Sequence, residues 1–296
     1  MKIVVTGASG QLGRLVAHQL LERTSEDEVI LITRRPHALA DLAERGAEVR
    51  YGDFDEPESL PEAFAGAERM LLISTSSIGD RTRQHGAALA AAAAAGVRHV
   101  AYTSLTNPVA GHPTGDVADE HRETEDLLLS SGLAWTILRY GAYADLQVPL
   151  GALAVSYGKL VTNAGDGRIA PISRHDCAAA AVAVLTTDGH ESKIYDVTGP
   201  EALTQADIAA LVSEVSGHAV EVMPIGDRRL AWALTRLGAP KTVARAIVNL
   251  GVATRENYFD VVDPAFEALT GRRPRSLRDV LITHRGELVN AERAVP

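Results

Sequence analysis

Short apolar runs alternate along the first half of the chain with longer segments in which apolar residues recur every three or four positions. Residues 2–6 form a β-branched run, a glycine turn follows, and residues 12–21 then carry helical spacing. Residues 29–33 are continuously apolar, as expected of a parallel strand buried on both faces. Four more strands are predicted at residues 48–51, 70–74, 99–104 and 135–139. This repetition predicts an α/β fold of the Rossmann type with a doubly wound, mostly parallel sheet.

Helical patterns separate these strands and continue beyond them. Between the strands, helices are predicted at residues 37–45, 57–64, 79–95 and 119–131. Gly46, Gly96 and Gly132 are expected to stop three of them. After about residue 145 the alternation weakens, with helices predicted at 148–158, 176–185 and 204–216 and a strand at 194–198. Thr204 is a plausible N-cap, with Asp207 in the first turn of its helix.

This change of pattern suggests two unequal parts. We expect a Rossmann domain over residues 1–147, to which residues 172–200 return. A smaller mixed subdomain over residues 148–171 and 201–296 is expected to cover the carboxyl ends of the strands and so the substrate.

The glycine turn after the first strand is a candidate phosphate-binding loop. It reads Thr6-Gly7-Ala8-Ser9-Gly10-Gln11-Leu12-Gly13 and leads directly into the first predicted helix. Gly7 permits the tight turn, Gly10 lets a pyrophosphate approach the backbone, and Gly13 allows close packing of helix and sheet. Free N–H groups at the helix start then bind the phosphates. The alternative is an ordinary strand-to-helix turn.

The end of the second predicted strand distinguishes NAD from NADP. An NAD site usually carries an acid there for the ribose 2′-hydroxyl, but this strand ends Ile32-Thr33-Arg34-Arg35. A guanidinium suits a 2′-phosphate, so NADPH is the expected cofactor, and the alternative is a solvated arginine pair. Asp53 and Phe54, after the third strand, either border the adenine or form a helix-entry turn.

Composition and charge exclude several other classes. The net charge of −9 and an aromatic content of 4% disfavour nucleic-acid and membrane-surface partners. No apolar stretch reaches the length of about 18 residues that a membrane span needs, and no signal-peptide pattern precedes the first strand. We therefore expect a cytoplasmic protein. Cys177, the only cysteine, is expected to be a buried structural thiol rather than a reactive one.

Other catalytic constellations are missing from the sequence. The histidines show no tight metal-ligand spacing, so no metal site is expected. Neither a Gly-x-Ser-x-Gly elbow nor a Gly-Lys-Ser/Thr loop is present, which argues against hydrolase and P-loop chemistry. The alanine-rich helix face over residues 87–95 is expected to pack internally or to form a homodimer contact.

Seven motifs occur in a fixed order that resembles a known family. The motifs are, in order, TGASGQLG, TRRP, YGDFD, LLISTS, YTSL, ADEHRETE and LRYGAY. The resemblance runs from Met1 to about Gly199 and is weaker, though collinear, beyond. Together they resemble the NmrA-like atypical short-chain dehydrogenases, and among these the bacterial NADPH-dependent quinone oxidoreductases of the QorB type.

The resemblance implies an NADPH site on matching positions. The segment from Thr6 to Leu12 would bind the pyrophosphate, and Arg34 the 2′-phosphate. The residues expected around the ribose and nicotinamide are Ser74, Thr75, Ser76, Arg139, Tyr140, Gly141, Ala142 and Tyr143, with residues 167–170, including Ala170, closing over them.

The chain departs from usual short-chain dehydrogenases at the proton donor. Ser104 occupies the expected serine position, but the Tyr-x-x-x-Lys pair falls at Val117 and His121. Hydride attack on a quinone gives an aromatic hydroquinonate, a weaker base than an alkoxide, so a strong proton donor is less necessary. Tyr143 and His121 are candidates to hydrogen-bond the acceptor oxygen, although His121 could instead be a structural helix residue.

Three functions remain open at this point. The first is an NADPH-dependent oxidoreductase acting on a quinone or similar conjugated carbonyl. The second is a non-catalytic NADP(H)-binding redox sensor of the NmrA type. The third is a reductase or epimerase of a nucleotide-linked or secondary-metabolite substrate, against which the missing Tyr-x-x-x-Lys pair weighs.

Overall fold

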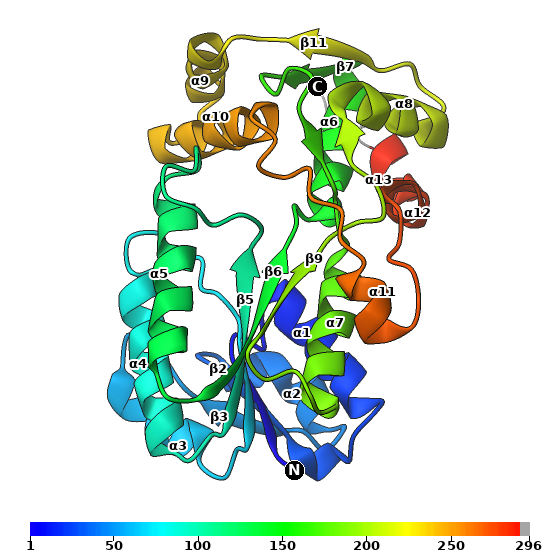
Figure 1. The fold of residues 1–296 in the computed structure, drawn as a ribbon. Coiled ribbons are helices and arrows are strands. Elements are labelled where there is room, and N and C mark those ends of the chain that lie inside the picture. The colour runs from blue at the N-terminus through cyan, green and yellow to red at the C-terminus, as the bar shows by residue number, and fades with distance from the viewer. Residues whose placement is uncertain (291–296) are drawn as a thin grey trace.

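The computed structural model describes residues 1–290, and a parallel sheet of seven strands forms its centre. The strands are β1 (Ile3–Val5), β2 (Val29–Thr33), β3 (Glu48–Tyr51), β4 (Arg69–Leu72), β5 (His99–Leu105), β6 (Ala134–Tyr140) and β9 (Lys193–Val197). Their order across the sheet is β3-β2-β1-β4-β5-β6-β9 (Figure 1). The order reverses between β1 and β4, and this reversal is where doubly wound sheets bind their ligands.

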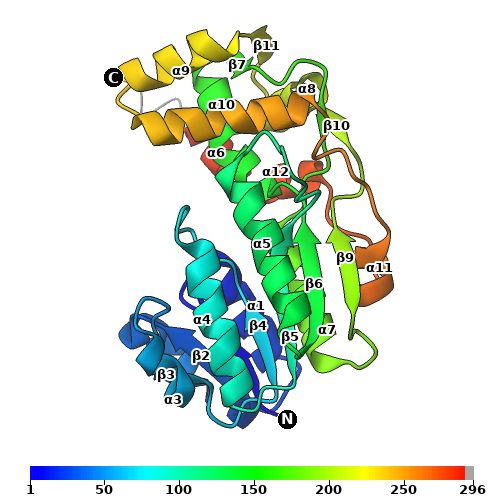
Figure 2. The same ribbon diagram turned by 60° about the vertical axis from the view of Figure 1, so that its left-hand side comes forward.

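Helices cover both faces of this sheet, as its apolar strands require (Figures 1 and 2). On one face lie α1 (Gln11–Leu21), α2 (Ala40–Ala43), α7 (Arg174–Thr186) and α11 (Ala265–Thr270). On the other lie α3 (Leu60–Phe64), α4 (Arg81–Ala94) and α5 (Asp116–Ser130). Short 3-10 turns complete the connections: η1 (Glu26–Glu28), η2 (Pro36–Leu39), η3 (Pro57–Ser59) and η4 (Ala144–Leu146). The expected Rossmann-type α/β fold is therefore confirmed.

A second group of elements with its own apolar core lies above the carboxyl ends of the strands (Figure 1). Its helices are α6 (Gln147–Tyr157), α8 (Gln205–Ser216), α9 (Asp227–Arg236), α10 (Lys241–Arg255), α12 (Leu277–Thr283) and α13 (Arg285–Asn290). Two small sheets join them: β7 (Lys159–Thr162) with β11 (Glu221–Pro224), and β8 (Arg168–Ile169) with β10 (Leu203–Thr204). These elements lie beyond the carboxyl edge of the main sheet, and none of them contributes a residue to the lining of the cleft described below.

Most predicted elements form close to their expected limits, and the differences have local causes. The helices expected at 37–45 and 57–64 each begin as a 3-10 turn with a proline in its first positions. The helix expected from residue 79 begins at Arg81, because Gly79 has a φ of +98°. Thr204 and Asp207 form a reciprocal capping box, which confirms the expected N-cap.

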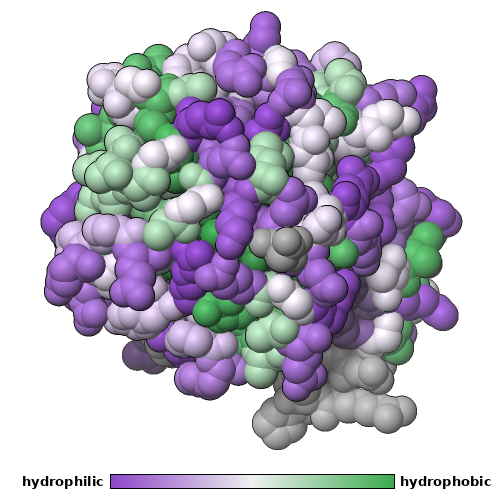
Figure 3. Space-filling view, turned by 90° about the horizontal axis from the view of Figure 1, so that it is seen from below, coloured by the Kyte–Doolittle hydropathy of each residue, from purple (hydrophilic) through white to green (hydrophobic). Residues whose placement is uncertain are grey.

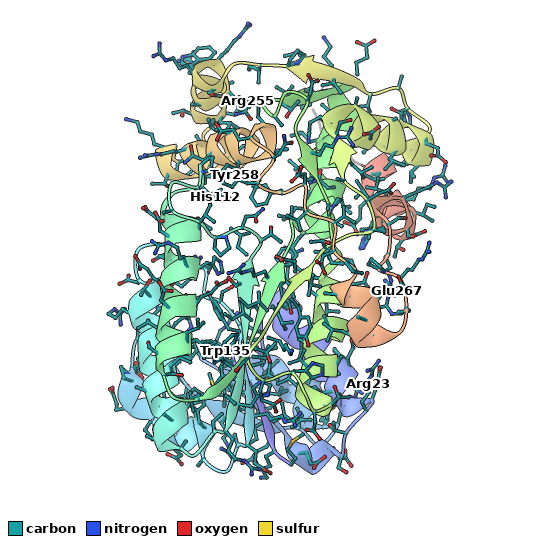
Figure 4. The ribbon with its side chains drawn as sticks, viewed as in Figure 1. Arg23, His112, Trp135, Arg255, Tyr258 and Glu267 are labelled. Atoms are coloured by element: carbon teal, nitrogen blue, oxygen red, sulfur yellow. The ribbon has the colours of Figure 1, made fainter. Side chains whose placement is uncertain are left out.

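One contact between the two groups of elements is a pair of aromatic rings. The rings of His112 and Tyr258 lie with their centroids 4.4 Å apart, and Figure 4 shows both beside α10. Asn107 adds a hydrogen bond from Nδ2 to the Tyr258 carbonyl at 2.9 Å. This contact fixes the loop after β5 against the segment after α10.

Cys177 is fully buried in α7, as expected of a structural thiol, and burial raises the pKa of its thiol well above the usual value.

Seen from below, hydrophilic side chains spread over most of the surface, with smaller hydrophobic areas between them (Figure 3). Within residues 1–290, no helix combines the length and apolar character that a membrane crossing requires.

Candidate cofactor site

A cleft of about 770 Å³ opens at the carboxyl edge of the sheet, around the reversal between β1 and β4. Its walls are the glycine loop (residues 7 and 9–13), the ends of β2, β3 and β4 (residues 32–35, 52–54 and 73–77), and the side chains of Gln84, Tyr143 and Arg174. Segments far apart in the sequence therefore meet in one elongated site.

The glycine loop has the geometry that a phosphate cradle needs. Gly7 has a φ of +59°, which allows the chain to turn directly after β1. The Gly10 amide donates to the Gly7 carbonyl at 2.9 Å, and α1 then begins at Gln11. A Cβ on Gly13 would overlap the Gly7 carbonyl and lie 2.7 Å from the Ala8 Cα, so only glycine fits there. The amides at the start of α1 are thus available to an anion in the cleft.

Thr6 and Ala8 support this loop without lining the cleft. Both are fully buried. The Thr6 hydroxyl donates to the Leu71 carbonyl at 3.1 Å and accepts from the Ile73 amide at 3.0 Å, which joins β1 to the end of β4. Within the predicted loop, these two residues have a structural position behind the glycines.

Two arginines lie where the 2′-phosphate is expected. Arg34 and Arg35 are exposed and line the cleft, and neither guanidinium forms a hydrogen bond or ion pair with another residue among 1–290. Asp53 and Phe54 line the same end. Asp55, the next residue, does not line the cleft. Its carboxylate accepts hydrogen bonds from Gln84 Nε2 at 3.0 Å and from Arg83 at 2.6 Å. These bonds hold the pKa of Asp55 below its usual range.

The segment from Ser74 to Ser76 lines the middle of the cleft and is fixed by side chains. The Ser74 amide donates to the Thr103 hydroxyl at 2.9 Å, and the Thr75 amide donates to His85 Nε2 at 3.2 Å. Arg81 Nε donates to the Thr75 carbonyl at 2.9 Å. Burial, followed by the Arg81 charge, lowers the pKa of His85 to about 3. His85 is therefore neutral at physiological pH and able to accept this bond.

Tyr143 and Arg174 form the far end of the cleft. The Arg174 guanidinium lies 4.4 Å from the centre of the Tyr143 ring, a cation–π distance. Burial raises the pKa of the Tyr143 phenol above its usual value, so the hydroxyl keeps its proton. The other residues expected beside the nicotinamide lie behind this surface: Arg139, Tyr140, Gly141, Ala142 and Ala170 are absent from the cleft lining.

Interactions inside the protein hold these residues away from the cleft lining. Arg139 Nη2 donates to Glu125 at 2.6 Å, and the Tyr140 hydroxyl donates to the Cys177 carbonyl at 2.9 Å. Gly141 packs closely on the segment at Ala170, whose carbonyl oxygen would lie 3.0 Å from a Cβ at Gly141. These residues support the turn that presents Tyr143.

Two of the three candidate catalytic residues are buried outside the cleft lining. The Ser104 hydroxyl donates to Glu125 Oε1 at 2.6 Å. His121 Nδ1 lies 2.7 Å from the Tyr102 hydroxyl, and burial, followed by the charges of Arg81 and His85, lowers its pKa well below the ordinary value. A histidine that stays neutral in this environment is a poor general acid near pH 7. The expectation of direct contact between these two residues and an acceptor in the cleft is not supported by their positions.

Several cleft residues were missed from the sequence. Arg174 and Gln84 are the clearest cases, together with Gly52 and Ile73. Arg174 belongs to a helix more than a hundred residues beyond the glycine loop, so no local motif connects the two. The one available signal was its place beside Ser173, which caps α7 by accepting from the Asp176 amide.

These residues fit a dinucleotide that carries a 2′-phosphate. The glycine cradle and the free amides of α1 suit the pyrophosphate, and two unpaired arginines at the end of β2 suit the 2′-phosphate. Within residues 1–290, no cluster of three or more His, Cys, Asp or Glu side chains could hold a metal ion. The fold and the cleft together define a dinucleotide-binding protein of the Rossmann class.

Comparisons with known proteins agree with this class. Residues 7–188 match the NAD(P)H-binding family, and the chain belongs to that family. It is 38% identical to quinone oxidoreductase 2 of Escherichia coli (strain K12) over 259 residues, which cover 87% of this chain and 90% of that protein. It is 28% identical to an NAD(P)H azoreductase of Xenophilus azovorans over 282 residues, with 95% and 97% of the two chains covered.

A solved structure extends the comparison to three dimensions. The crystal structure of an NADPH-dependent quinone oxidoreductase from Escherichia coli, complexed with NADPH, has a TM-score of 0.91 and 35% identity, covering 95% of this chain and 99% of that one. The resemblance inferred from the sequence motifs is confirmed, and so is NADPH as the cofactor. The class of NADPH-dependent oxidoreductase is supported over the non-catalytic sensor.

Proposed function

We propose that this protein transfers hydride from NADPH to a quinone or a similar conjugated carbonyl acceptor. The observation that carries the proposal is Tyr143, which lines the far end of the cleft and whose phenol keeps its proton because burial raises its pKa. The names of the relatives support an acceptor of this kind, because one reduces quinones and another is an azoreductase.

We also infer that the reaction proceeds without the Tyr-x-x-x-Lys pair of usual short-chain dehydrogenases. The corresponding positions in this chain are Val117 and His121, and neither lines the cleft. Bound NADPH supplies the hydride. Hydride transfer adds one proton and two electrons to the quinone and gives a hydroquinonate anion, which takes a second proton from water.

In this proposal the protein mainly positions the reactants and stabilises the anionic product. Tyr143 keeps its phenolic proton because burial raises its pKa, so it serves as a hydrogen-bond donor to the acceptor oxygen. Arg81 and His85 fix the Ser74–Ser76 segment through hydrogen bonds to Thr75, and this segment supports the cofactor in the middle of the cleft.

The proposal is tested by NADPH oxidation with a panel of simple quinones, followed by absorbance, alongside cofactor titrations. We expect turnover with quinones and little with simple ketones, whose alkoxide products need a stronger proton donor. Tight binding of NADP(H) without turnover on any quinone would reject the proposal and favour a sensor. Turnover of ketones at rates equal to those of quinones would also argue against it.

A further inference from the structure

Arg174 is a largely enclosed cation that forms a long ion pair with Asp145 but donates no hydrogen bond from its guanidinium within residues 1–290. Its side chain is 15% exposed and lines the cleft. The guanidinium donates no hydrogen bond to any other residue among 1–290, and its nearest carboxylate oxygen, Asp145 Oδ1, is 3.7 Å away. A guanidinium carries five N–H donors, and enclosing them without partners costs free energy. An acceptor from outside the protein is therefore expected.

The surroundings of Arg174 hold its side chain in one place. The Tyr143 ring supports the guanidinium at 4.4 Å, and Asp145 Oδ2 accepts from the Arg174 amide at 2.8 Å. Ser173 caps α7 at the preceding position. The guanidinium is thus positioned by its neighbours, lines the cleft and makes no hydrogen bond with another residue among 1–290.

The lining of the cleft indicates which anion Arg174 meets. α1 and α7 pack together on one face of the sheet, where Gln19, in the last turns of α1, donates through Nε2 to the His175 carbonyl at 3.1 Å. The start of α1 and Arg174 line the same cleft. The start of α1 is also where the glycine loop receives a pyrophosphate.

The strand order separates Arg174 from the arginines of the 2′-phosphate end. Arg34 follows β2 on one side of β1, whereas Tyr143, beneath Arg174, follows β6 on the other side of β1 and β4. NADPH carries two anionic groups, the 2′-phosphate and the pyrophosphate. One cationic site for each group matches this arrangement.

We propose that Arg174 binds the pyrophosphate of the cofactor, as the cationic complement of the glycine loop. It would then contribute equally to NADPH and NADH, whereas Arg34 would contribute to NADPH alone. The proposal concerns the cofactor rather than the acceptor, so binding measurements test it even if quinone turnover fails.

The test compares Arg174→Met with Arg34→Ala, measuring dissociation constants by isothermal titration calorimetry. The ligands are NADPH, NADH and adenosine 2′-monophosphate, which has the 2′-phosphate but no pyrophosphate. For Arg174→Met we expect about tenfold weaker binding of both dinucleotides and unchanged binding of adenosine 2′-monophosphate. For Arg34→Ala we expect weaker binding of NADPH and adenosine 2′-monophosphate, with NADH unchanged. Arg174→Lys keeps the charge without the planar fork, so its dissociation constants for both dinucleotides should lie between those of wild type and Arg174→Met.

Three results would overturn the proposal. Weaker binding of NADPH alone in Arg174→Met would assign Arg174 to the 2′-phosphate. Unchanged binding of both dinucleotides with slower quinone reduction would assign it to the acceptor. If Arg174→Met also loses adenosine 2′-monophosphate, the cleft itself is damaged and Arg174→Lys decides: unequal effects on NADPH and NADH, or none, would reject the proposal.

Discussion

The two ends of the cleft are built from different kinds of surface. At the β2 end, Arg34 and Arg35 are exposed and have no ion-pair partner among residues 1–290. At the β6 end, Tyr143 is partly buried and Arg174 is 15% exposed. The first end suits recognition of a charged group that is itself partly solvated, and the second suits chemistry from which water is largely excluded.

This difference suggests a division of labour along the cofactor. Electrostatic attraction is weaker between exposed charges, so the β2 end needs two arginines and relies on the hydrogen-bond fork for selectivity. At the β6 end the same interactions act in a less polar environment and are stronger. The glycine loop lies between the two ends and serves both.

The largest effect should come from the loop that both ends share. Gly13→Ala places a Cβ against the backbone of Gly7 and Ala8, which cannot move aside as a flexible side chain would. We expect loss of measurable NADPH and NADH binding and a loss of stability at the upper end of the range of about 1–3 kcal/mol for overpacking. Nicotinamide fluorescence titration and thermal unfolding measure these two effects.

Gly86→Ala is a matched control for that substitution. Gly86 lies inside α4, and its added Cβ would meet only Leu127 Cδ1 at 3.7 Å, an ordinary contact. Cofactor binding should be unchanged and stability equal or slightly higher, because alanine favours helix. Normal binding by Gly13→Ala would show that the close packing of this loop is unnecessary.

A smaller effect is expected at the β6 end alone. Tyr143→Phe removes the phenolic donor but keeps the ring beneath Arg174. We expect kcat for quinone reduction to fall about tenfold or more, with the NADPH dissociation constant unchanged. In the wild type, the rate should not depend on a phenol ionisation between about pH 6 and 9, because burial raises the Tyr143 pKa and its proton stays in place. Unchanged kcat would remove Tyr143 from the reaction.

The smallest effect concerns His85, which fixes the Ser74–Ser76 segment by accepting from the Thr75 amide. Burial lowers the pKa of His85 to about 3, whereas in the unfolded chain a histidine titrates near 6.5. As the pH falls from about 6.5 towards 3, the unfolded chain therefore binds a proton that the folded protein excludes, and stability decreases. Above about pH 6.5 both states are neutral and this contribution to stability is fully present.

His85→Gln should reduce that pH dependence while keeping an acceptor for the Thr75 amide. The slope of the unfolding free energy against pH should fall by about one proton, or about 1.4 kcal/mol per pH unit, between roughly pH 6 and 4. Urea unfolding at several pH values measures it. His37→Gln changes an exposed histidine and should leave the slope unaltered. An equal slope in wild type and His85→Gln would contradict the burial of a neutral His85.

The two ends also differ in how far the sequence predicts them. Gly7, Gly10 and Gly13 follow β1, and Arg34 follows the neighbouring strand β2, so a local motif and a strand end are enough to place them. Arg174 reaches the same cleft from α7, and only the packing of α7 on α1 brings it there.

The buried candidates show a second limit. The resemblance to short-chain dehydrogenases predicts catalytic positions at Ser104 and His121, but position in the chain does not reveal the partner of a side chain. Glu125 accepts the Ser104 hydroxyl, and Tyr102 contacts the His121 ring. These partners come from α5 and β5 and turn both side chains inward, away from the cleft lining.

The division of labour along the cleft is tested most directly by the preference for NADPH over NADH in wild type and Arg34→Ala, measured as kcat/KM with one quinone. We expect the wild type to prefer NADPH strongly and Arg34→Ala to lower the ratio on the order of a hundredfold. The kcat at saturating cofactor should stay the same, because the β6 end is intact. An unchanged ratio, or a kcat that falls together with it, would contradict the separation of cofactor recognition from hydride transfer.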